Sequence, residues 1–467
     1  MPDTHHPHLF DDQAAAALRS RLGNTFATGR THDLAWRKRQ LLAVAQWLRD
    51  ADDAIMTALA ADLGKPALES YGTETGFCLA EIRHTLAHLE AWAAPERVSS
   101  PMVNLPSRSW MRHQPKGVAL IIAPWNYPLQ LAVAPMVAAL SAGCCVVLKP
   151  SELAPATSAL MAEALPRVLD AEAVAVVEGD VAVSTALLAQ PWDHILFTGS
   201  TRVGRVVMEA AAKHLSPVTL ELGGKSPVIV SRDADITLAA KRIAWGKGVN
   251  AGQTCIAPDY VLVERAVQDR FQHEIIATFK RFYGDDPQLS PDLARICTPA
   301  HHARLVGLLD GGTILHGGRH DVRDRFLEPT LLTDVDLDAP VMQEEIFGPI
   351  LPIVPVDDLD EAIAFINARP HPLALYLFTR DDARVDRVLG RTLSGGACIN
   401  DTLSHIAVSD LHFGGVGASG MGGYHGVHGF RTFSHTRGVV QRYGVADVPL
   451  RYPPYAGNLK WIRKVMR

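Results

Sequence analysis

The sequence predicts an α/β protein built around parallel sheets. From about residue 115, short apolar runs of strand length alternate with longer segments of helical periodicity, which is the pattern of strand–helix–strand units. Short polar and glycine-containing loops follow several of these runs, as expected where an open α/β sheet binds a ligand. With 467 residues, 48% of them hydrophobic, the chain is long enough to bury sizeable cores.

The first part of the chain predicts a helical region followed by a parallel sheet. Residues 20–95 read as mainly helical, and the stretch 33–51 has apolar residues at helical spacing. We expect these helices to pack on a first sheet. Its predicted strands are 118–123, 144–148, 173–177 and 194–197. Because the carboxyl ends of parallel strands meet at one edge, the loops at Asn126, at 149–152 and at Gly199 should converge on one crevice.

A second α/β segment begins after Gly224 and predicts a separate domain. Its predicted strands are 227–230, 260–263, 350–354, 374–378 and 397–400. The glycine-rich run 414–423 predicts a tight irregular loop.

Composition and charge exclude several classes of protein. The net charge of −5 argues against a nucleic-acid partner, and the six cysteines show neither a disulfide framework nor a CxxC pair, which favours reduced thiols in a cytoplasmic protein without a metal site. Residues 1–8 lack the features of a secretory signal, and no apolar run approaches the ~20 residues of a membrane span. The mixed basic and apolar segment 459–467 predicts a terminal helix packed on its own subunit, with an anionic membrane as the alternative partner.

Cys255 and Glu221 are the candidate reactive residues. Cys255 follows the small and polar residues Gly252-Gln253-Thr254, a setting in which a thiolate can approach a substrate, and Glu221 can activate a water molecule. This pair is what covalent oxidation of an aldehyde needs. The alternatives are that Cys255 is an inert buried residue and that Glu221 is a surface acid at a strand end. Cys144 and Cys145 lie inside a predicted strand and are assigned to the core.

The segment Phe197–Gly204 is a candidate pyrophosphate site. It follows a predicted strand and opens a helix, where backbone N–H groups and the helix dipole can hold a phosphate, although such glycines are also common for conformational reasons. Glu152 could accept hydrogen bonds from the ribose hydroxyls of NAD or simply stabilise a helix start, and Lys149 could contact the ribose or be exposed.

Three other patterns are rejected as sites. The run 224–226 resembles the end of a P-loop but lacks the required upstream glycine. The run 246–251 fits a dinucleotide pattern but follows a helix-like segment, so it predicts the turn that delivers Cys255. His84 and His88 are predicted to lie on a solvated helix surface because the order of a zinc helix is absent.

Taken together, six motifs resemble those of the aldehyde dehydrogenase superfamily, and the resemblance extends from about Arg112 to Arg442. In chain order they are Pro124-Trp125-Asn126-Tyr127-Pro128, Lys149-Pro150-Ser151-Glu152, Phe197-Thr198-Gly199-Ser200, Glu221-Leu222-Gly223-Gly224-Lys225, Gly252-Gln253-Thr254-Cys255 and Glu344-Glu345-Ile346-Phe347-Gly348-Pro349. Residues 213–219 and 413–435 look like the class 3 branch, which includes fatty, aromatic and coniferyl aldehyde dehydrogenases; among these the coniferyl type is favoured.

The resemblance implies a catalytic role for three residues. Cys255 attacks the aldehyde, the Asn126 amide and the Cys255 backbone N–H hold the oxyanion, and Glu221 deprotonates the water that hydrolyses the thioester. Glu345 would share the role of base. The resemblance implies NAD as the better cofactor, with NADP as an alternative. The implied cofactor-binding residues are Trp125, Lys149, Glu152, Gly199, Ser200, Gly204, Leu222, Gly223, Glu345 and Phe347.

The resemblance also implies a domain plan, a substrate and a partner. We expect an aldehyde dehydrogenase-like fold with a Rossmann-type cofactor domain at 1–222, an α/β catalytic domain at 223–400, and a return to the cofactor domain with an oligomerisation tail at 401–467. A hairpin at 97–115 would join the tail in a homodimer interface. The expected substrate is a medium-chain or aromatic aldehyde.

Three alternatives stay open. One is an acylating enzyme that discharges the thioester to coenzyme A, although Glu221 argues against it. Another is a catalytically silent NAD-binding or structural protein on the same fold. The last is a cysteine hydrolase that pairs Cys255 with a histidine.

Overall fold

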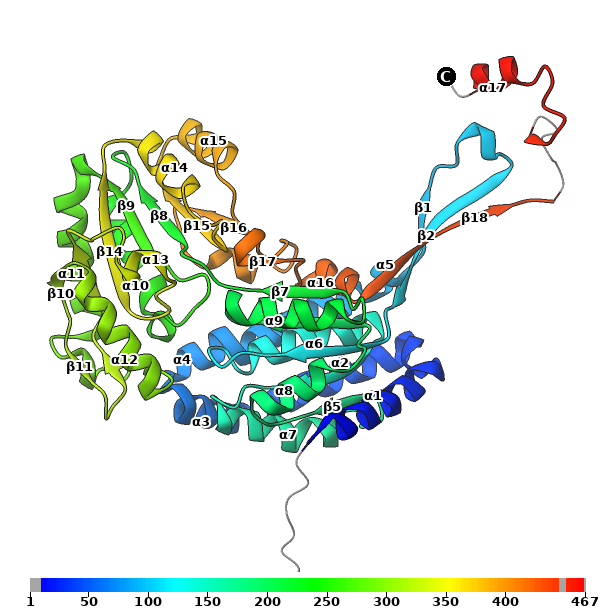
Figure 1. Cartoon of the computed structure of the whole chain (residues 1–467). Helices are drawn as coiled ribbons and strands as arrows, with labels where there is room; N and C mark the ends of the chain where they lie inside the picture. The colour runs from blue at the N-terminus through cyan, green and yellow to red at the C-terminus, as the bar shows by residue number, and fades with distance from the viewer. Residues whose placement is uncertain (1–9, 445–450, 466–467) are drawn as a thin grey trace, which may run out of the picture.

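Two large sheets, a projecting three-stranded arm and surrounding helices make up the chain (Figure 1). The computed structural model describes residues 10–444 and 451–465. The N-terminal region is helical, as predicted. Its α-helices are α1 (Asp12–Ala27), α2 (Leu34–Asp50), α3 (Asp52–Leu63), α4 (Ala67–Ser70) and α5 (Gly76–Ala93).

The first sheet has six strands in the order β17-β7-β6-β3-β4-β5. They are β3 (Val118–Ile122), β4 (Cys145–Lys149), β5 (Val174–Val176), β6 (His194–Thr198), β7 (Val218–Glu221) and β17 (Gly420–Met421). All neighbours are parallel except β17, which runs antiparallel to β7. The four strands predicted from the apolar runs are therefore present, with ends that differ by at most one residue.

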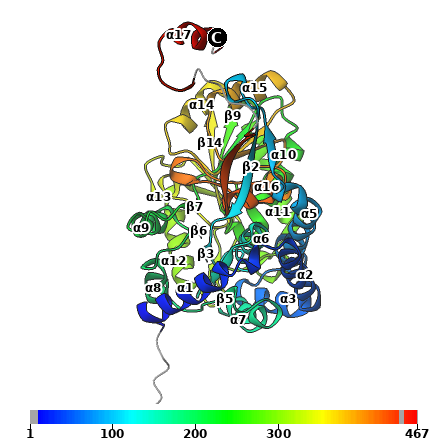
Figure 2. The ribbon, with the colours of Figure 1, turned by 90° about the vertical axis from the view of Figure 1, so that its right-hand side faces the viewer.

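Helices cover both faces of this sheet. Figure 2 shows α1, α8 (Val181–Leu188) and α9 (Thr201–Ala212) on one side, and α2, α5 and α6 (Gln130–Ala142) on the other; α7 (Pro155–Val168) packs beside β5. Because helices cover both faces, β3 and β4 are buried at every position. This burial explains their nearly continuous apolar sequences. Cys144 and Cys145 are both fully buried, as predicted.

The second sheet has seven strands in the order β10-β13-β14-β9-β8-β15-β16, parallel except for β10. They are β8 (Pro227–Val230), β9 (Tyr260–Glu264), β10 (Thr313–His316), β13 (Thr330–Thr333), β14 (Ile350–Val356), β15 (Ala374–Phe378) and β16 (Gly396–Ile399). Its α-helices are α10 (Ile236–Gly248), α11 (Gln268–Tyr283), α12 (Pro299–Leu308), α13 (Pro340–Gln343), α14 (Leu359–Asn367) and α15 (Asp382–Arg391). A two-stranded ribbon of β11 (His320–Asp321) and β12 (Phe326–Leu327) completes this region.

A three-stranded antiparallel arm projects from the body (Figure 1). The hairpin of β1 (Glu96–Val98) and β2 (Ser107–Pro115) lies where a hairpin was predicted. The strand β18 (Ser434–Arg442), which follows α16 (Gly426–Thr432), pairs with the whole of β2. Segments from the first quarter and the last tenth of the chain are therefore joined side by side.

The C-terminal helix and the glycine-rich run both differ from expectation. Helix α17 (Leu459–Val465) exists, but it lies beyond the tip of the arm rather than packed on its own subunit, and Leu459 and Trp461 are 61% and 51% exposed (Figure 1). The run 414–423 is not irregular throughout, because its residues 420–421 form β17 at the edge of the first sheet. Neither difference is visible in residue periodicity, since both depend on which distant surface is available.

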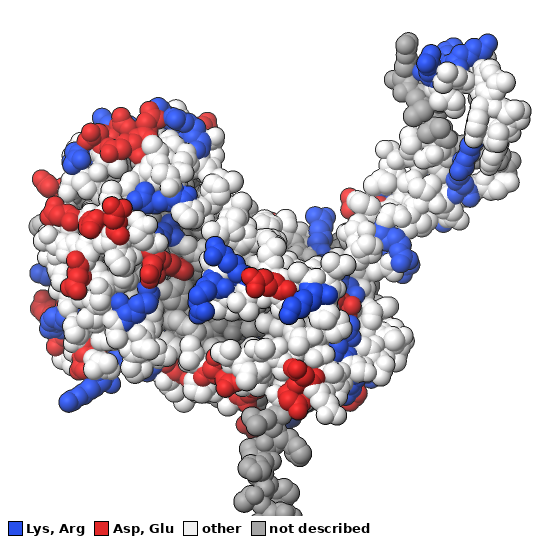
Figure 3. Space-filling model, viewed as in Figure 1, with Lys and Arg blue, Asp and Glu red and all other residues white. Residues whose placement is uncertain are grey.

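Charge is mixed over the body. Figure 3 shows Lys and Arg interspersed with Asp and Glu there, whereas the arm shows mainly Lys and Arg on this face. None of the helices in residues 10–444 and 451–465 is both long and apolar enough to cross a bilayer.

Candidate active site

A cavity of about 360 Å³ has both candidate reactive residues in its wall. Glu221 ends β7 of the first sheet, and Cys255 follows α10 of the second domain segment, so the two come from different halves of the chain. Most of the other lining side chains are apolar. They include Phe77, Leu131, Trp245, Val249, Ile256, Leu373, Leu403, Ile406 and Phe413.

A left-handed turn delivers Cys255 to this cavity. After α10, Asn250 and Ala251 both have φ of 52°, and Gly252 has φ of 73°. A Cβ atom on Gly252 would lie 2.3 Å from the Gly348 carbonyl oxygen, so only glycine fits. Gln253 Nε2 donates to the Arg295 carbonyl oxygen (3.0 Å) and its Oε1 accepts from the Cys297 N–H (2.9 Å), which anchors the turn. The predicted turn therefore begins later than expected: residues 246–248 end α10, and the turn itself is Val249–Gly252.

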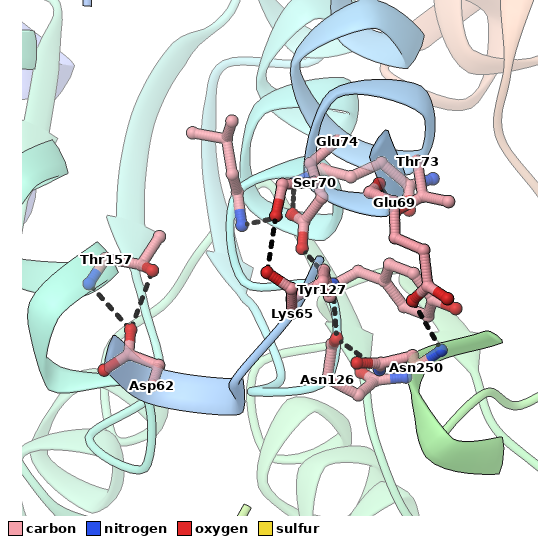
Figure 4. Close-up of polar contacts among 12 residues, drawn as sticks. Asp62, Lys65, Glu69, Ser70, Thr73, Glu74, Asn126, Tyr127, Thr157 and Asn250 are labelled. Carbon is pink, nitrogen blue, oxygen red and sulfur yellow. Dashed lines mark hydrogen bonds and ion pairs between the residues drawn. The ribbon is translucent and has the colours of Figure 1, made fainter. Parts of the chain in front are cut away.

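Asn126 lies next to this turn, in the loop after β3. Its Nδ2 donates to the Gln253 carbonyl oxygen (3.1 Å), and its own carbonyl oxygen accepts from Asn250 Nδ2 (2.8 Å) (Figure 4). That single bond uses one of the two N–H groups of the Asn126 amide, and no acceptor among the described residues takes the other. The two loops that carry Asn126 and Cys255 are therefore hydrogen-bonded to each other.

The fully buried ion pair Lys65–Glu74 contacts the loop that carries Asn126. Lys65 Nζ lies 2.5 Å from Glu74 Oε1 and also donates to the Asn126 carbonyl oxygen (3.3 Å). The other Glu74 oxygen accepts from the Leu129 and Gln130 N–H groups, each at 2.9 Å (Figure 4). Lys65 also lies over the Tyr127 ring, 4.2 Å from its centroid. These contacts fix the backbone from Asn126 to Gln130.

Burial favours the neutral forms of Glu221 and Cys255. Glu221 is 2% exposed, and neither of its carboxyl oxygens has a hydrogen-bond partner among the described residues. Burial raises the pKa of Glu221 well above its usual value. Burial, with Glu345 and Glu221 nearby, raises the pKa of the Cys255 thiol to about 12. The alternative in which Glu221 is a surface acid is therefore wrong.

The pyrophosphate candidates lie at the edge of the first sheet. Ser200 caps α9 through its side chain, which accepts from the Val203 N–H (3.4 Å), and the Gly199 N–H donates to the Glu221 carbonyl oxygen (3.0 Å). A Cβ atom on Gly204 would lie 2.8 Å from the Leu222 side chain, so glycine lets the helix approach the strand end closely. Gly199, Ser200, Gly204 and Leu222 are thus brought together.

Lys149, a predicted ribose contact, is the last residue of β4, and Glu152 follows in the next loop. Lys149 Nζ, on a side chain that is 2% exposed, lies 2.8 Å from Glu152 Oε2, whereas the Glu152 side chain is 40% exposed and free to accept further hydrogen bonds. The alternative prediction that Lys149 is exposed is therefore wrong.

Glu345 and Phe347 contact other predicted cofactor-binding residues. A Cβ atom on Gly223 would lie 2.1 Å from a Glu345 carboxyl oxygen, so these two residues are in direct contact. Burial, with Asp259 nearby, raises the pKa of Glu345 to about 8, and its Oε1 has no partner within residues 10–444 and 451–465. The Phe347 ring lies 5.3 Å from the Trp125 ring, edge to face.

These residues fit a dinucleotide cofactor. The N-terminus of α9 has no acidic residue in its first turn and can donate N–H groups to a phosphate. The exposed Glu152 carboxylate and the unpartnered Glu345 oxygen can accept hydrogen bonds from ribose hydroxyls. No cluster of His, Cys, Asp and Glu that could hold a metal occurs in the described part of the chain. His84 is only partly exposed and lies 3.3 Å from Asp410, so the predicted solvated surface holds only in part.

Comparison with known proteins decides the family. The sequence model of the aldehyde dehydrogenase family matches residues 10–439. The chain belongs to the aldehyde dehydrogenase family. This aldehyde dehydrogenase has relatives in family 3, and enzymes of this kind oxidise aldehydes with NAD(P).

Three comparisons place the enzyme within its family. It is 48% identical to aldehyde dehydrogenase family 3 member A2 of Mus musculus, over 95% of this chain and 92% of that one. It is 44% identical to the 4,4'-diaponeurosporen-aldehyde dehydrogenase of Staphylococcus aureus (strain NCTC 8325 / PS 47), over 94% and 96%. A solved structure of the substrate-bound state of Staphylococcus aureus AldH has a TM-score of 0.95 at 42% identity and covers 97% of this chain and 99% of that one. The resemblance to the superfamily and to its class 3 branch is confirmed.

Several residues of this aldehyde dehydrogenase escaped sequence reasoning. The motifs marked Asn126 and Cys255, but Lys65, Glu74 and Asn250 carry no motif of their own. Only Asn250 could have been suspected from the sequence, because Asn tolerates the left-handed backbone conformation that a tight turn before Cys255 requires. The Lys65–Glu74 pair could not be found, since it depends on where α4 and α5 pack.

Proposed function

We propose that this aldehyde dehydrogenase oxidises a medium-chain or aromatic aldehyde, with coniferyl aldehyde as the favoured candidate, to the carboxylic acid. The observation that carries the proposal is that Cys255 and Glu221 share the wall of one largely apolar cavity. An apolar cavity selects an apolar substrate, because polar groups that enter it lose their hydrogen bonds to water. The name of the staphylococcal relative points to another apolar aldehyde.

In the proposed mechanism, the Cys255 thiol gives up its proton to solvent, the thiolate sulfur bonds to the aldehyde carbon, and the carbonyl oxygen becomes an oxyanion. The free Asn126 N–H and the Cys255 backbone N–H donate to that oxyanion, while the contacts of Asn126 with Gln253 keep the amide in place. When bound, NAD(P) supplies the hydride acceptor. The acyl group, held as a thioester on Cys255, is released by water from which Glu221 takes a proton, and Glu345 shares this role.

We further propose NAD as the better cofactor, with NADP as an alternative, because the open Glu152 carboxylate would accept ribose hydroxyls and repel a 2′-phosphate. Trp125, Lys149, Ser200 and Phe347 would contact the cofactor with the residues around them. Residues 1–222, 223–400 and 401–467 serve as cofactor domain, catalytic domain and returning tail. The arm and tail would form the interface of a cytoplasmic homodimer; the exposed Leu459 and Trp461 support this assignment.

The test is NADH formation with coniferyl aldehyde, benzaldehyde and decanal, in wild type and Cys255→Ala, without coenzyme A. We expect turnover in wild type and none in the variant, and the order of rates ranks the substrates. A strong preference for a small charged semialdehyde would contradict the proposed substrate class.

The remaining outcomes separate the alternatives. Turnover that appears only when coenzyme A is added would move the enzyme to the acylating branch. Ester hydrolysis by Cys255 in the absence of any nicotinamide would support a cysteine hydrolase, and binding of NAD without any turnover would support a silent protein.

A further inference from the structure

A second carboxyl group, Glu69, lies in the wall of the same cavity as Cys255 and Glu221. It belongs to the short helix α4, which precedes the buried ion pair residue Glu74. The same wall includes the apolar residues Leu68, Phe77, Trp245, Val249 and Ile406. Nothing in the proposed mechanism uses this carboxyl group, because its protein groups are Cys255, Asn126, Glu221 and Glu345.

Glu69 lies toward the open end of the cavity. The adjacent Leu68 is 86% exposed and Trp245 is 47% exposed, whereas Glu221 is 2% exposed. A substrate whose aldehyde carbon reaches Cys255 would therefore direct its remote end toward Glu69.

One Glu69 oxygen is fixed and the other is free. Oε2 accepts from the Asn250 N–H (2.9 Å), a contact drawn in Figure 4. Oε1 makes no hydrogen bond to any described residue, and it is not among the polar atoms sealed inside the protein. Thr73 Oγ1 donates to the Glu69 backbone oxygen (2.7 Å) and so leaves the carboxyl group unused. The fixed oxygen holds the free oxygen in one orientation.

No described residue donates a hydrogen bond to Glu69 Oε1, and the carboxyl group is largely buried. Burial raises the pKa of Glu69 to about 7, offset in part by the Asn250 N–H and by Lys65. A polar group that loses contact with water gains stability from any donor that reaches it, and an ionised acceptor gains most. Ionised or neutral, the free oxygen can accept a hydrogen bond.

We propose that Glu69 selects, among apolar aldehydes, those that carry a hydrogen-bond donor such as a phenolic hydroxyl at the end remote from the carbonyl. This inference rests on the proposed oxidation of an apolar aldehyde at Cys255. It adds the group that recognises the other end of the substrate.

A purely structural role for Glu69 is the competing explanation. Its bond to the Asn250 N–H supports the left-handed turn that delivers Cys255, so removal of the side chain could slow the enzyme on every aldehyde alike. The variant Glu69→Gln separates the two roles. Its amide oxygen can still accept from Asn250, but its amide nitrogen, which is a donor, would then face the cavity.

The experiment compares kcat/KM for 4-hydroxycinnamaldehyde and 4-methylcinnamaldehyde, and for the shorter pair 4-hydroxybenzaldehyde and 4-methylbenzaldehyde. Each pair differs only in a hydroxyl and a methyl group. Their unequal intrinsic reactivity cancels when the hydroxyl-to-methyl ratio is compared between variants. Glu163→Gln, the same change at an exposed residue of α7, is the control.

We expect the ratio in at least one pair to fall about tenfold in Glu69→Gln, as for loss of a hydrogen bond to a charged group, and to stay at the wild-type value in the control. An equal loss for both members of each pair would overturn the inference and leave Glu69 with a structural role. Failure of wild type to oxidise any of the four aldehydes would instead overturn the proposed function, so the two failures are distinguishable.

Discussion

At the scale of single residues, burial without a partner sets the chemistry of the site. The two oxygens of Glu221 and one oxygen of Glu345 are buried and unpartnered among the described residues. A carboxyl group in such surroundings holds its proton more tightly than in water, and a raised pKa brings it closer to the pH at which a base works best. The same burial keeps the Cys255 thiol neutral until a substrate or cofactor changes its surroundings.

Replacement of Glu221 by Gln should stall the enzyme after one round. Cys255 and Asn126 are intact in this variant, so NADH should form in a burst of at most one equivalent per site. Release of the acid should then slow by ~10²–10⁴, the usual contribution of a general base. Stopped-flow absorbance at the NADH band measures both phases.

The pH profile gives a second check on Glu221. The base acts only when ionised, and burial raises its pKa, so the steady-state rate of wild type should rise with pH beyond the range of an ordinary glutamate. Glu221→Gln should lose this rise. Equal steady-state rates and profiles in the two proteins would assign the proton transfer elsewhere, with Glu345 as the next candidate.

At the scale of elements, parallel strands and one turn bring the site residues together. β3, β4 and β6 are neighbours and run in one direction, so the loops that hold Asn126, Lys149 and Gly199 open at one edge. The helical layer also contributes, because Lys65 lies just before α4 and Glu74 just after it, and the pair contacts the Asn126 loop. An element that contains no reactive residue thus positions one that does.

Loss of one member of the Lys65–Glu74 pair should destabilise the fold and slow catalysis. Lys65→Met leaves Glu74 buried without its cation, which typically costs about 3–5 kcal/mol of unfolding free energy. The freed Asn126 loop should lower kcat more than it raises KM. Chemical denaturation and steady-state kinetics measure the two effects.

The double variant Lys65→Met with Glu74→Gln serves as the control. It removes both charges, so it should recover much of the stability lost in the single variant. Strictly additive losses of stability, or unchanged kinetics in Lys65→Met, would argue that the pair does not position Asn126.

At the scale of the whole molecule, the sequence predicts strands and motifs that lie within a few residues, but it does not predict contacts between distant segments. Apolar runs located most strands of both sheets but missed β7, β10, β13 and β17. Motifs located Cys255, Glu221 and Asn126, because each signal lies within a few residues. Glu69 and Lys65 could not be found, since their importance arises only when the N-terminal helices pack against the catalytic loops. The predicted packing of α17 on its own subunit was wrong, because it too depends on contacts between segments far apart in the sequence.

Folding stability should also depend on a buried neutral histidine. Burial, with Lys116 nearby, lowers the pKa of His194 to about 3, and its ring contacts Lys116 and Thr219. A group with a lowered pKa contributes its full stability above its unfolded pKa of about 6.5 and loses it progressively as the pH falls toward 3. At pH 5 the loss is about 2 kcal/mol.

Buried carboxyl groups act in the opposite sense, so the test is a comparison of variants. Unfolding of wild type and His194→Gln is measured between pH 7 and pH 5, with His273→Gln, at an exposed position of α11, as the control. We expect wild type and the control to lose about 2 kcal/mol relative to His194→Gln over this range. Parallel pH profiles for all three proteins would contradict the role of His194.

The pairing of β18 with β2 sets an order for biosynthesis. β2 leaves the ribosome early in translation, but its partner emerges only near the end, and β17 likewise reaches β7 late. A nascent chain that has completed every other strand of the first sheet must still hold the edge of β7 and one side of β2 unpaired. Unpaired edges recruit other chains, so the interval before release is when this enzyme most needs protection from its own neighbours on the polysome.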